Sequence, residues 1–193
     1  MEANPPAHWP SLASHSLCQT PWLTVTRETI ASPSRPHGTE WTVVRRAVAA
    51  VVAPRTADGN YVLIRQERLP ARREFWEFPA GQVEGEVCER AIRETALREL
   101  GEEAALLCRA PLLPLGLFYS SPGFSDECCH LFLADGVEPA PDLRQHDANE
   151  AIHEVRHFSP NDLLQAVGDG KICDANTLAC FARLQARGIF FPR

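Results

Sequence analysis

The sequence lacks the features of membrane, secreted and nucleic-acid-binding proteins. No apolar run approaches the roughly 18 residues that a membrane-spanning helix needs, and no basic region followed by an apolar one stands at the N-terminus. The formal net charge of -6 disfavours broad binding to nucleic acid. We therefore expect a cytoplasmic protein with no membrane partner and no nucleic-acid partner.

The cysteines also lack the pattern of a disulfide-linked or metal-binding protein. There are seven, an odd number, and they show none of the paired spacings typical of zinc sites. Cys128 and Cys129 fall in a predicted strand, where adjacent side chains point to opposite faces. We expect reduced thiols in a reducing compartment.

The chain does have the composition of an ordinary soluble domain, with 45% apolar and 23% charged residues in a length of 193. Residues 1–20 show no steady periodicity and are expected to form a flexible arm. Turn residues fill 32–38, and a long polar connection covers 135–150. Ser159 and Asp174 are expected to cap two C-terminal helices, the second ended by Gly188. Strands are expected at 22–28, 40–46, 47–53, 60–66, 112–119, 128–134 and 152–158, which predicts an α/β fold.

The most informative stretch is a predicted amphipathic helix from Val87 to about Leu107. Four apolar residues recur within it at helical spacing and predict one apolar stripe: Leu97, Leu100, Ala104 and Leu107. Most of its charged residues have a partner of opposite sign four positions away: Glu89–Arg93, Arg90–Glu94, Glu94–Arg98 and Arg98–Glu102.

Glu99 and Glu103 are the exceptions in this helix. They are stacked about 6 Å apart along the helix axis, and neither has a Lys or Arg three or four positions away. Clustered carboxylates without basic partners suit a hard divalent cation such as Mg²⁺. The alternative is a solvated acidic face.

The residues around this pair resemble the signature of a known family. Gly81, Gly85-Glu86, the Arg98-Glu99-Leu100 run and Glu102-Glu103 are similar to the Nudix box. The interval from Glu86 to Arg98 is about four residues longer than usual, close to one helical turn, which leaves the carboxylates nearly in phase. Ala105 stands where the box has glycine, and we interpret this as a longer helix.

Further motifs resemble one branch of the family, the ADP-ribose pyrophosphatases. They are Arg65–Arg68, Glu77–Gly81, Ser121–Glu127 and Gly170–Ala175. The resemblance implies a Nudix-type α/β/α sandwich around a mixed sheet, with an N-terminal strand subdomain. It divides the chain into a flexible arm (1–20), dimer-forming N-terminal strands (21–46) and a Nudix hydrolase domain (47–193).

By the same resemblance, Glu99, Glu103 and the backbone carbonyl of Ala80 hold Mg²⁺, with Mn²⁺ as the alternative metal. Glu102 is implied as a further ligand or an orienting group. Arg98 is implied to orient the carboxylates, although an ordinary surface pair with neighbouring glutamates explains it equally well.

The family places a general base just before the last strand, which points to Glu150. Glu154 is a rival because the strand register there is offset by about one residue, and His153 is another. For His153, a solvent-facing strand histidine is the simpler reading.

Substrate contacts are implied by resemblance as well. Trp22 and Trp41 match positions that sandwich adenine, one from each subunit of a homodimer, although strand tryptophans are commonly core residues. Arg46 and Arg68 match phosphate-contacting arginines. Pro122 and Gly123 belong to the selectivity loop.

These residues lead to the hypothesis of a homodimeric enzyme that splits ADP-ribose, or a similar nucleoside diphosphate sugar, into AMP and ribose 5-phosphate. One rival is the same chemistry on another nucleotide sugar or a dinucleotide, such as GDP-mannose or NADH. A rival from another class is a non-catalytic Nudix module that binds a nucleotide sugar.

Overall fold

The structure is a computed structural model that describes residues 9–145 and 151–192. These residues divide into two compact units. The N-terminal unit contains residues 9–47 and the loop 121–127, and the main unit contains residues 48–120, 128–145 and 151–192. Among the described residues, none of the helices combines the length and the apolar character that spanning a membrane requires.

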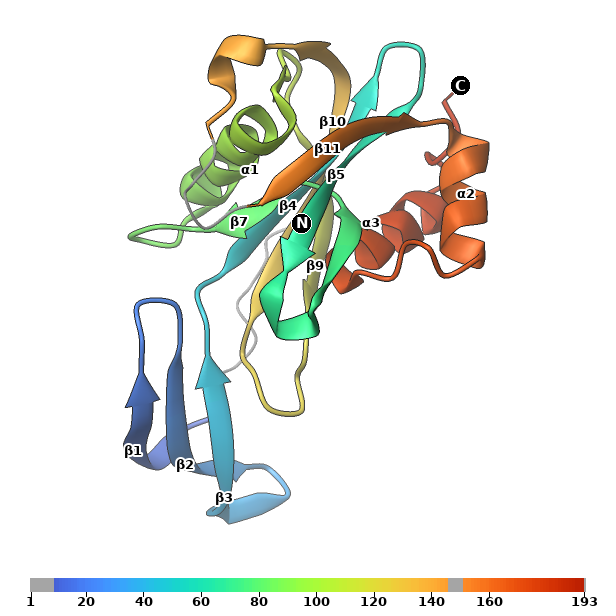
Figure 1. The fold of residues 1–193 in the computed structure, drawn as a ribbon. Helices are drawn as coiled ribbons and strands as arrows, with labels where there is room; N and C mark the ends of the chain where they lie inside the picture. The colour runs from blue at the N-terminus through green and yellow to red at the C-terminus, as the bar shows by residue number, and fades with distance from the viewer. Residues whose placement is uncertain (1–8, 146–150, 193) are drawn as a thin grey trace. The chain divides into compact units, whose positions relative to one another are not determined.

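The N-terminal unit is a three-stranded antiparallel sheet in the order β1-β2-β3 (Figure 1). The expected flexible arm is wrong for residues 11–19, which pair with β2. Every side chain of β1 is exposed, so this strand has no apolar face for sequence patterning to reveal.

The predicted turn at 32–38 is also shorter than expected, because β3 begins within it. The strands are β1 (Ser11–Gln19), β2 (Thr24–Ser32) and β3 (Arg35–Arg45).

The main unit contains a mixed sheet in which β10 runs parallel to β4 and the other paired strands are antiparallel. The order is β11-β5-β4-β10-β8, and β6, β7 and β9 pair with β5, β4 and β10. The strands are β4 (Ala49–Thr56), β5 (Tyr61–Arg68), β6 (Arg73–Glu77), β7 (Ala80–Gln82), β8 (Leu106–Leu107), β9 (Leu113–Tyr119), β10 (Cys128–Pro139) and β11 (Ile152–Phe158). Short 3-10 turns follow β5 (Leu69–Ala71) and β10 (Pro141–Leu143).

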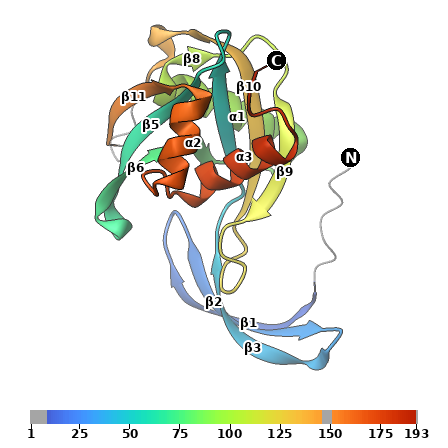
Figure 2. The ribbon, with the colours of Figure 1, turned by 90° about the vertical axis from the view of Figure 1, so that its right-hand side faces the viewer.

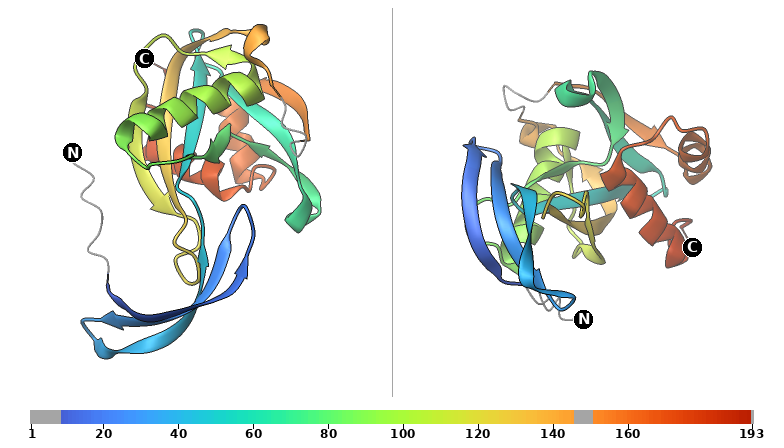
Figure 3. Two further views of the ribbon diagram at one scale, coloured as in Figure 1. Left: turned by 90° about the vertical axis from the view of Figure 1, so that its left-hand side faces the viewer. Right: turned by 90° about the horizontal axis from the view of Figure 1, so that it is seen from below.

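Helices cover both faces of this sheet. Helix α1 (Glu89–Ala104) lies on one face, and α2 (Pro160–Gly168) and α3 (Ala175–Ala186) lie on the other (Figures 2 and 3). Central strand β4 is therefore buried on both sides: Val51 contributes to the core under α2 and α3, and Val52 to the core under α1. The predicted α/β/α sandwich around a mixed sheet is confirmed.

The C-terminal elements follow the sequence prediction closely. Strand β11 has the expected bounds, Ser159 accepts a hydrogen bond from the Asp162 N–H at the start of α2, and Asp174 accepts one from the Thr177 N–H at the start of α3. Strand β10 is longer than predicted, because it continues to Pro139 through the expected polar connection.

The expected long helix is wrong at both ends. Helix α1 begins after Cys88, ends at Ala104, and is followed by Ala105 with a left-handed φ of 55°. The chain has to turn there because the next two residues form β8, which pairs with β10. Ala105 therefore occupies the position where glycine has the lower conformational cost. The predicted stripe also shifts, since Leu97 is 41% exposed.

Ala105→Gly is expected to raise the free energy of unfolding by about 0.5–1 kcal/mol, because glycine adopts a positive φ without the steric cost that alanine carries. The urea denaturation midpoint measures this. Ala91→Gly, inside the first turns of α1, is the matched control and is expected to lower the midpoint by a similar amount. A loss of stability in both variants would contradict the assigned helix end.

Candidate active site

Helix α1 places two glutamates on its buried face. Ala96 and Leu100 pack in the core beneath the helix, and Glu99 and Glu103 lie on the same side with only 4% and 1% of their surface exposed. The alternative of a solvated acidic face is therefore wrong. Carboxylates buried this deeply need polar or cationic contacts to remain ionised.

The backbone of β7 lies against both carboxylates. Glu103 Oε2 accepts a hydrogen bond of 2.9 Å from the Ala80 N–H. A Cβ atom added to Gly81 would lie 1.7 Å from Glu99 Oε1, so any side chain at this position would displace the carboxylate. The glycine of the motif is thus explained by the close approach of Glu99 to the backbone.

Arg98 is the cation nearest to this pair along the helix. Its Nη2 lies 2.6 Å from Glu99 Oε1 and its Nη1 lies 2.5 Å from Glu102 Oε2. Spacing of three or four residues did not reveal the contact with Glu99, because Arg98 is its immediate chain neighbour. Pairing at four-residue spacing correctly gave Arg98–Glu102, while Glu94 lies 3.6 Å from Arg90.

The donor set fits a divalent cation. Glu99, Glu102 and Glu103 bring carboxylate oxygens to the last turns of α1, beside the backbone of Ala80, and hard cations such as Mg²⁺ take oxygen ligands. Because glycine has no Cβ atom, the Glu99 carboxylate can lie against the backbone of Gly81. These residues are the ones that would hold the metal.

A second ion pair joins Arg68 of β5 to Glu77 of β6, the strand that precedes Ala80 in the chain. Arg68 Nε and Nη2 donate to the carboxylate of Glu77, at 2.5 to 3.1 Å, and Glu77 is only 2% exposed. Burial raises the pKa of Glu77, against the opposing effect of Arg68. The guanidinium of Arg68 is thereby fixed while 41% of its side chain stays exposed, as an anion-contacting group requires. Sequence reasoning did not assign a role to Glu77.

The N-terminal unit contains the other implied substrate residues. Trp41 and Trp22 are 50% and 64% exposed, so neither is a core tryptophan. Trp41 Nε1 donates a hydrogen bond of 2.8 Å to the Gly123 carbonyl, which fixes the edge of the indole against the loop that also contains Pro122. The loop 121–127 is thus part of the same unit as the tryptophans.

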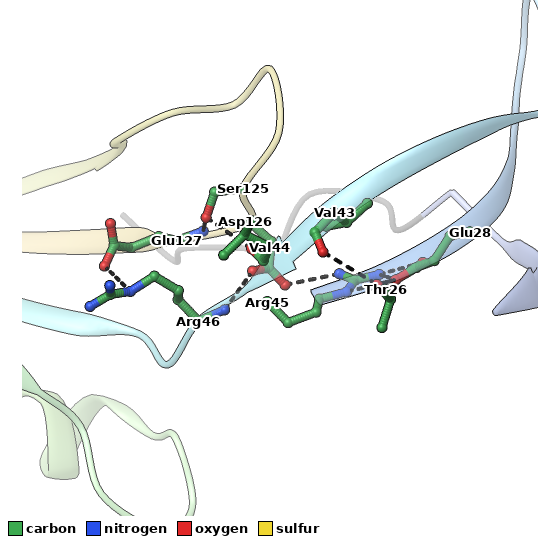
Figure 4. A network of polar contacts seen from close by, with 9 residues as sticks. All are labelled: Thr26, Glu28, Val43, Val44, Arg45, Arg46, Ser125, Asp126 and Glu127. Carbon is green, nitrogen blue, oxygen red and sulfur yellow. Dashed lines mark hydrogen bonds and ion pairs between the residues drawn. The ribbon is translucent and has the colours of Figure 1, made fainter. Parts of the chain in front are cut away.

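Two arginines tie this loop to β3 (Figure 4). Arg46 Nε lies 2.8 Å from Glu127 Oε1, and the Arg46 N–H donates to Asp126. Arg45, which sequence reasoning missed, contacts Asp126 at 2.8 Å and binds the buried carboxylate of Glu28 with two nitrogens. Nothing in the sequence distinguishes Arg45 from Arg46, and only the structure shows that β3 ends between them.

The structure describes two of the three candidate general bases. Glu150 lies outside the described residues. Glu154 lies 3.8 Å from Arg65, and His153 Nε2 lies 2.9 Å from Glu67 and 3.7 Å from Glu74. The expected solvent-facing strand histidine is confirmed, since 47% of the His153 side chain is exposed in β11 while it also contacts these two carboxylates.

Glu67, Glu74 and His153 can each offer one ligand atom, all within 4.8 Å of one another, so they are a second place in the described chain where a cation would fit. Arg65 Nη2 lies 2.5 Å from Glu74, so an arginine contacts a carboxylate here as Arg98 does at α1.

Comparison with known proteins places the chain in a family. The model of the NUDIX domain matches residues 44–179, so the chain belongs to the NUDIX domain family. The family resemblance predicted from the sequence is confirmed, and so is the enzyme class of a Nudix hydrolase. Members of this family generally use divalent metal ions.

Similar proteins are known both by sequence and by structure. An ADP-ribose pyrophosphatase of Bacillus subtilis (strain 168) is 35% identical over 146 residues, which cover 75% of this chain and 76% of that protein. The methanol dehydrogenase activator of Bacillus methanolicus is 33% identical over 144 residues, covering 74% and 75%. A solved structure of an ADP compounds hydrolase matches with a TM-score of 0.73 at 16% identity, covering 94% of this chain and 97% of that one.

Proposed function

We propose that this protein hydrolyses the pyrophosphate bond of ADP-ribose, or of a similar nucleoside diphosphate sugar, to AMP and ribose 5-phosphate, with Mg²⁺ as its metal and Mn²⁺ as a substitute. The observation that carries the proposal is the burial of Glu99 and Glu103 against the backbone of Ala80 and Gly81. Similarity to the B. subtilis ADP-ribose pyrophosphatase supports the choice of substrate class.

The site residues of the main unit have separate roles in the proposed reaction. Glu99, Glu103 and the Ala80 carbonyl hold the metal, and Glu102 is a further ligand or an orienting group. Arg98 fixes the carboxylates of Glu99 and Glu102 by its two contacts. The bound metal supplies charge neutralisation at the pyrophosphate and lowers the pKa of a water molecule.

The substrate is held by residues that the fold has already oriented. Arg68, fixed by Glu77, donates to phosphate oxygens. Arg46 is assigned the same task, and Trp22 and Trp41 offer exposed indole faces for stacking on the base. Pro122 and Gly123 form the loop that selects the remainder of the substrate. Glu150 is the proposed general base, with Glu154 and His153 as the rivals.

The protein is proposed to act as a homodimer, for which the N-terminal unit provides the argument. Among its described residues, the buried apolar side chains are those of Ala31 and Val43, while Leu12 and Leu17 of β1 are 55% and 44% exposed. A sheet with so small a core gains little stability from its own burial and is completed by a partner. Light scattering is expected to give twice the chain mass of 21.4 kDa. A monomeric mass at micromolar concentration would contradict this.

A substrate panel tests the proposed reaction. With Mg²⁺, ADP-ribose is expected to yield AMP and ribose 5-phosphate at a higher kcat/KM than GDP-mannose or NADH yields its products, and a chelator is expected to abolish turnover. Preference for GDP-mannose or NADH would favour the rival substrate. Binding without any product after long incubation would favour the non-catalytic module.

A further inference from the structure

The short link between β6 and β7 presents Ala80 to the proposed metal site. It consists of Phe78 and Pro79, which lie outside both strands. A backbone segment buried in this way must have its N–H and C=O groups paired if it is to keep one conformation. Its hydrogen bonds therefore show what holds Ala80 in place.

Side chains from opposite faces of the sandwich hold this link. The Phe78 N–H donates to Thr177 Oγ1 of α3 at 2.9 Å, and the Ala80 N–H donates to Glu103 Oε2 of α1 at 2.9 Å. Pro79 has no N–H, and its carbonyl accepts from the Val52 N–H of β4 at 3.0 Å. Each N–H from Phe78 to Ala80 is thus paired with a side chain of a helix.

The hydroxyl of Thr177 is itself held in one orientation. Thr177 is fully buried, and its Oγ1 donates to Asp174 Oδ2 at 3.0 Å, while its N–H donates to the same oxygen at 2.8 Å. The proton of the hydroxyl is therefore directed at Asp174, which leaves a lone pair for Phe78. The N-cap of α3 thus becomes part of a chain of hydrogen bonds that ends at the link.

We propose that Thr177, oriented by Asp174, is a positioning residue of the metal site: by fixing the Phe78–Pro79 link it sets the place of the Ala80 carbonyl, and so the affinity for the divalent cation. This inference rests on the proposed function through the metal ligands named there. It assigns to α3, which contributes no proposed ligand, a direct effect on metal binding.

Mn²⁺ binding followed by electron paramagnetic resonance, with the metal alone and no substrate, tests the inference. Thr177→Val keeps the shape of the side chain and removes the hydroxyl, and it is expected to raise the Kd for Mn²⁺ by about tenfold. Thr177→Ser restores the hydroxyl and is expected to stay within about twofold of the wild type. Ser159→Ala, which removes the N-cap of α2, is the control and is expected to lower the melting temperature without changing the Kd.

A folded Thr177→Val protein with wild-type affinity would overturn the inference, as would equal weakening by Ser159→Ala. If Thr177→Val does not fold, Asp174→Ala decides: a rise of about threefold in Kd is expected from a misoriented hydroxyl, and no change overturns the inference. A wild-type protein that does not bind Mn²⁺ overturns both the metal assignment and the inference. A wild-type protein that binds Mn²⁺ without hydrolysing ADP-ribose overturns the proposed function alone.

Discussion

Glu103→Gln is expected to lower kcat/KM for ADP-ribose by about 10³-fold at saturating Mg²⁺, because the substitution removes a full negative charge from the proposed metal site. The glutamine has nearly the same shape, and its amide oxygen can still accept the hydrogen bond that Glu103 receives from Ala80. The loss would therefore reflect the charge rather than the fold. Steady-state kinetics with product quantification measures it.

Glu94→Gln is the matched control for this experiment. Glu94 lies on the same helix, its side chain is 63% exposed, and it pairs only loosely with Arg90 at 3.6 Å. Neutralising it is expected to change kcat/KM by less than about twofold. Equal losses in the two variants would mean that the general charge of α1, rather than the buried pair, determines activity.

Arg45→Met is expected to destabilise the N-terminal unit by about 3 kcal/mol, because it leaves a buried carboxylate without its partner. Glu28 is 3% exposed, and Arg45 binds its two oxygens at 2.6 and 2.7 Å (Figure 4). The substitution also breaks the contact with Asp126 that ties the loop 121–127 to β3. Hydrogen exchange of β2, β3 and this loop should therefore accelerate together.

Arg27→Met provides the control within the same sheet. Arg27 lies 3.8 Å from Glu40, and both side chains are more than half exposed, so this pair contributes less than about 1 kcal/mol. Its removal is expected to leave hydrogen exchange almost unchanged. Similar exchange rates in the two variants would contradict the assigned role of Arg45.

The same ion pair makes the stability of the N-terminal unit depend on pH. Burial acts to raise the pKa of Glu28, but hydrogen bonds from Arg45 and Thr26 outweigh it, and the pKa lies below its ordinary value. Its contribution is therefore complete above the ordinary pKa of about 4.3 and is lost as the pH falls through the lower folded value. In Arg45→Met only burial and the weaker contacts remain, so this loss of protection at acid pH is expected to shrink.

Local patterns in the sequence were sufficient for much of the main unit. The caps Ser159 and Asp174 and the strand β11 depend on residues close in the chain, and structure agrees with prediction there. The special status of Glu99 and Glu103 was also visible from their spacing. Their burial was not, since it depends on the approach of the Gly81 backbone from another element.

What sequence reasoning missed depends on contacts between distant parts of the chain. Thr177 meets Phe78 across 99 residues, and Arg45 meets Asp126 across 81, so no local pattern marks them. The left-handed Ala105 was missed for another reason: alanine favours helix by propensity, and only the pairing of β8 with β10 requires the turn. Strand β1 was missed because it has no buried face.

A crystal structure with Mg²⁺ and a non-hydrolysable analogue of ADP-ribose tests the central claim most directly. We expect a cation bound by the carboxylates of Glu99 and Glu103 and by the Ala80 carbonyl, in contact with the pyrophosphate of the analogue. A cation bound instead by Glu67, Glu74 and His153, with Glu99 and Glu103 still contacting only protein groups, would contradict it.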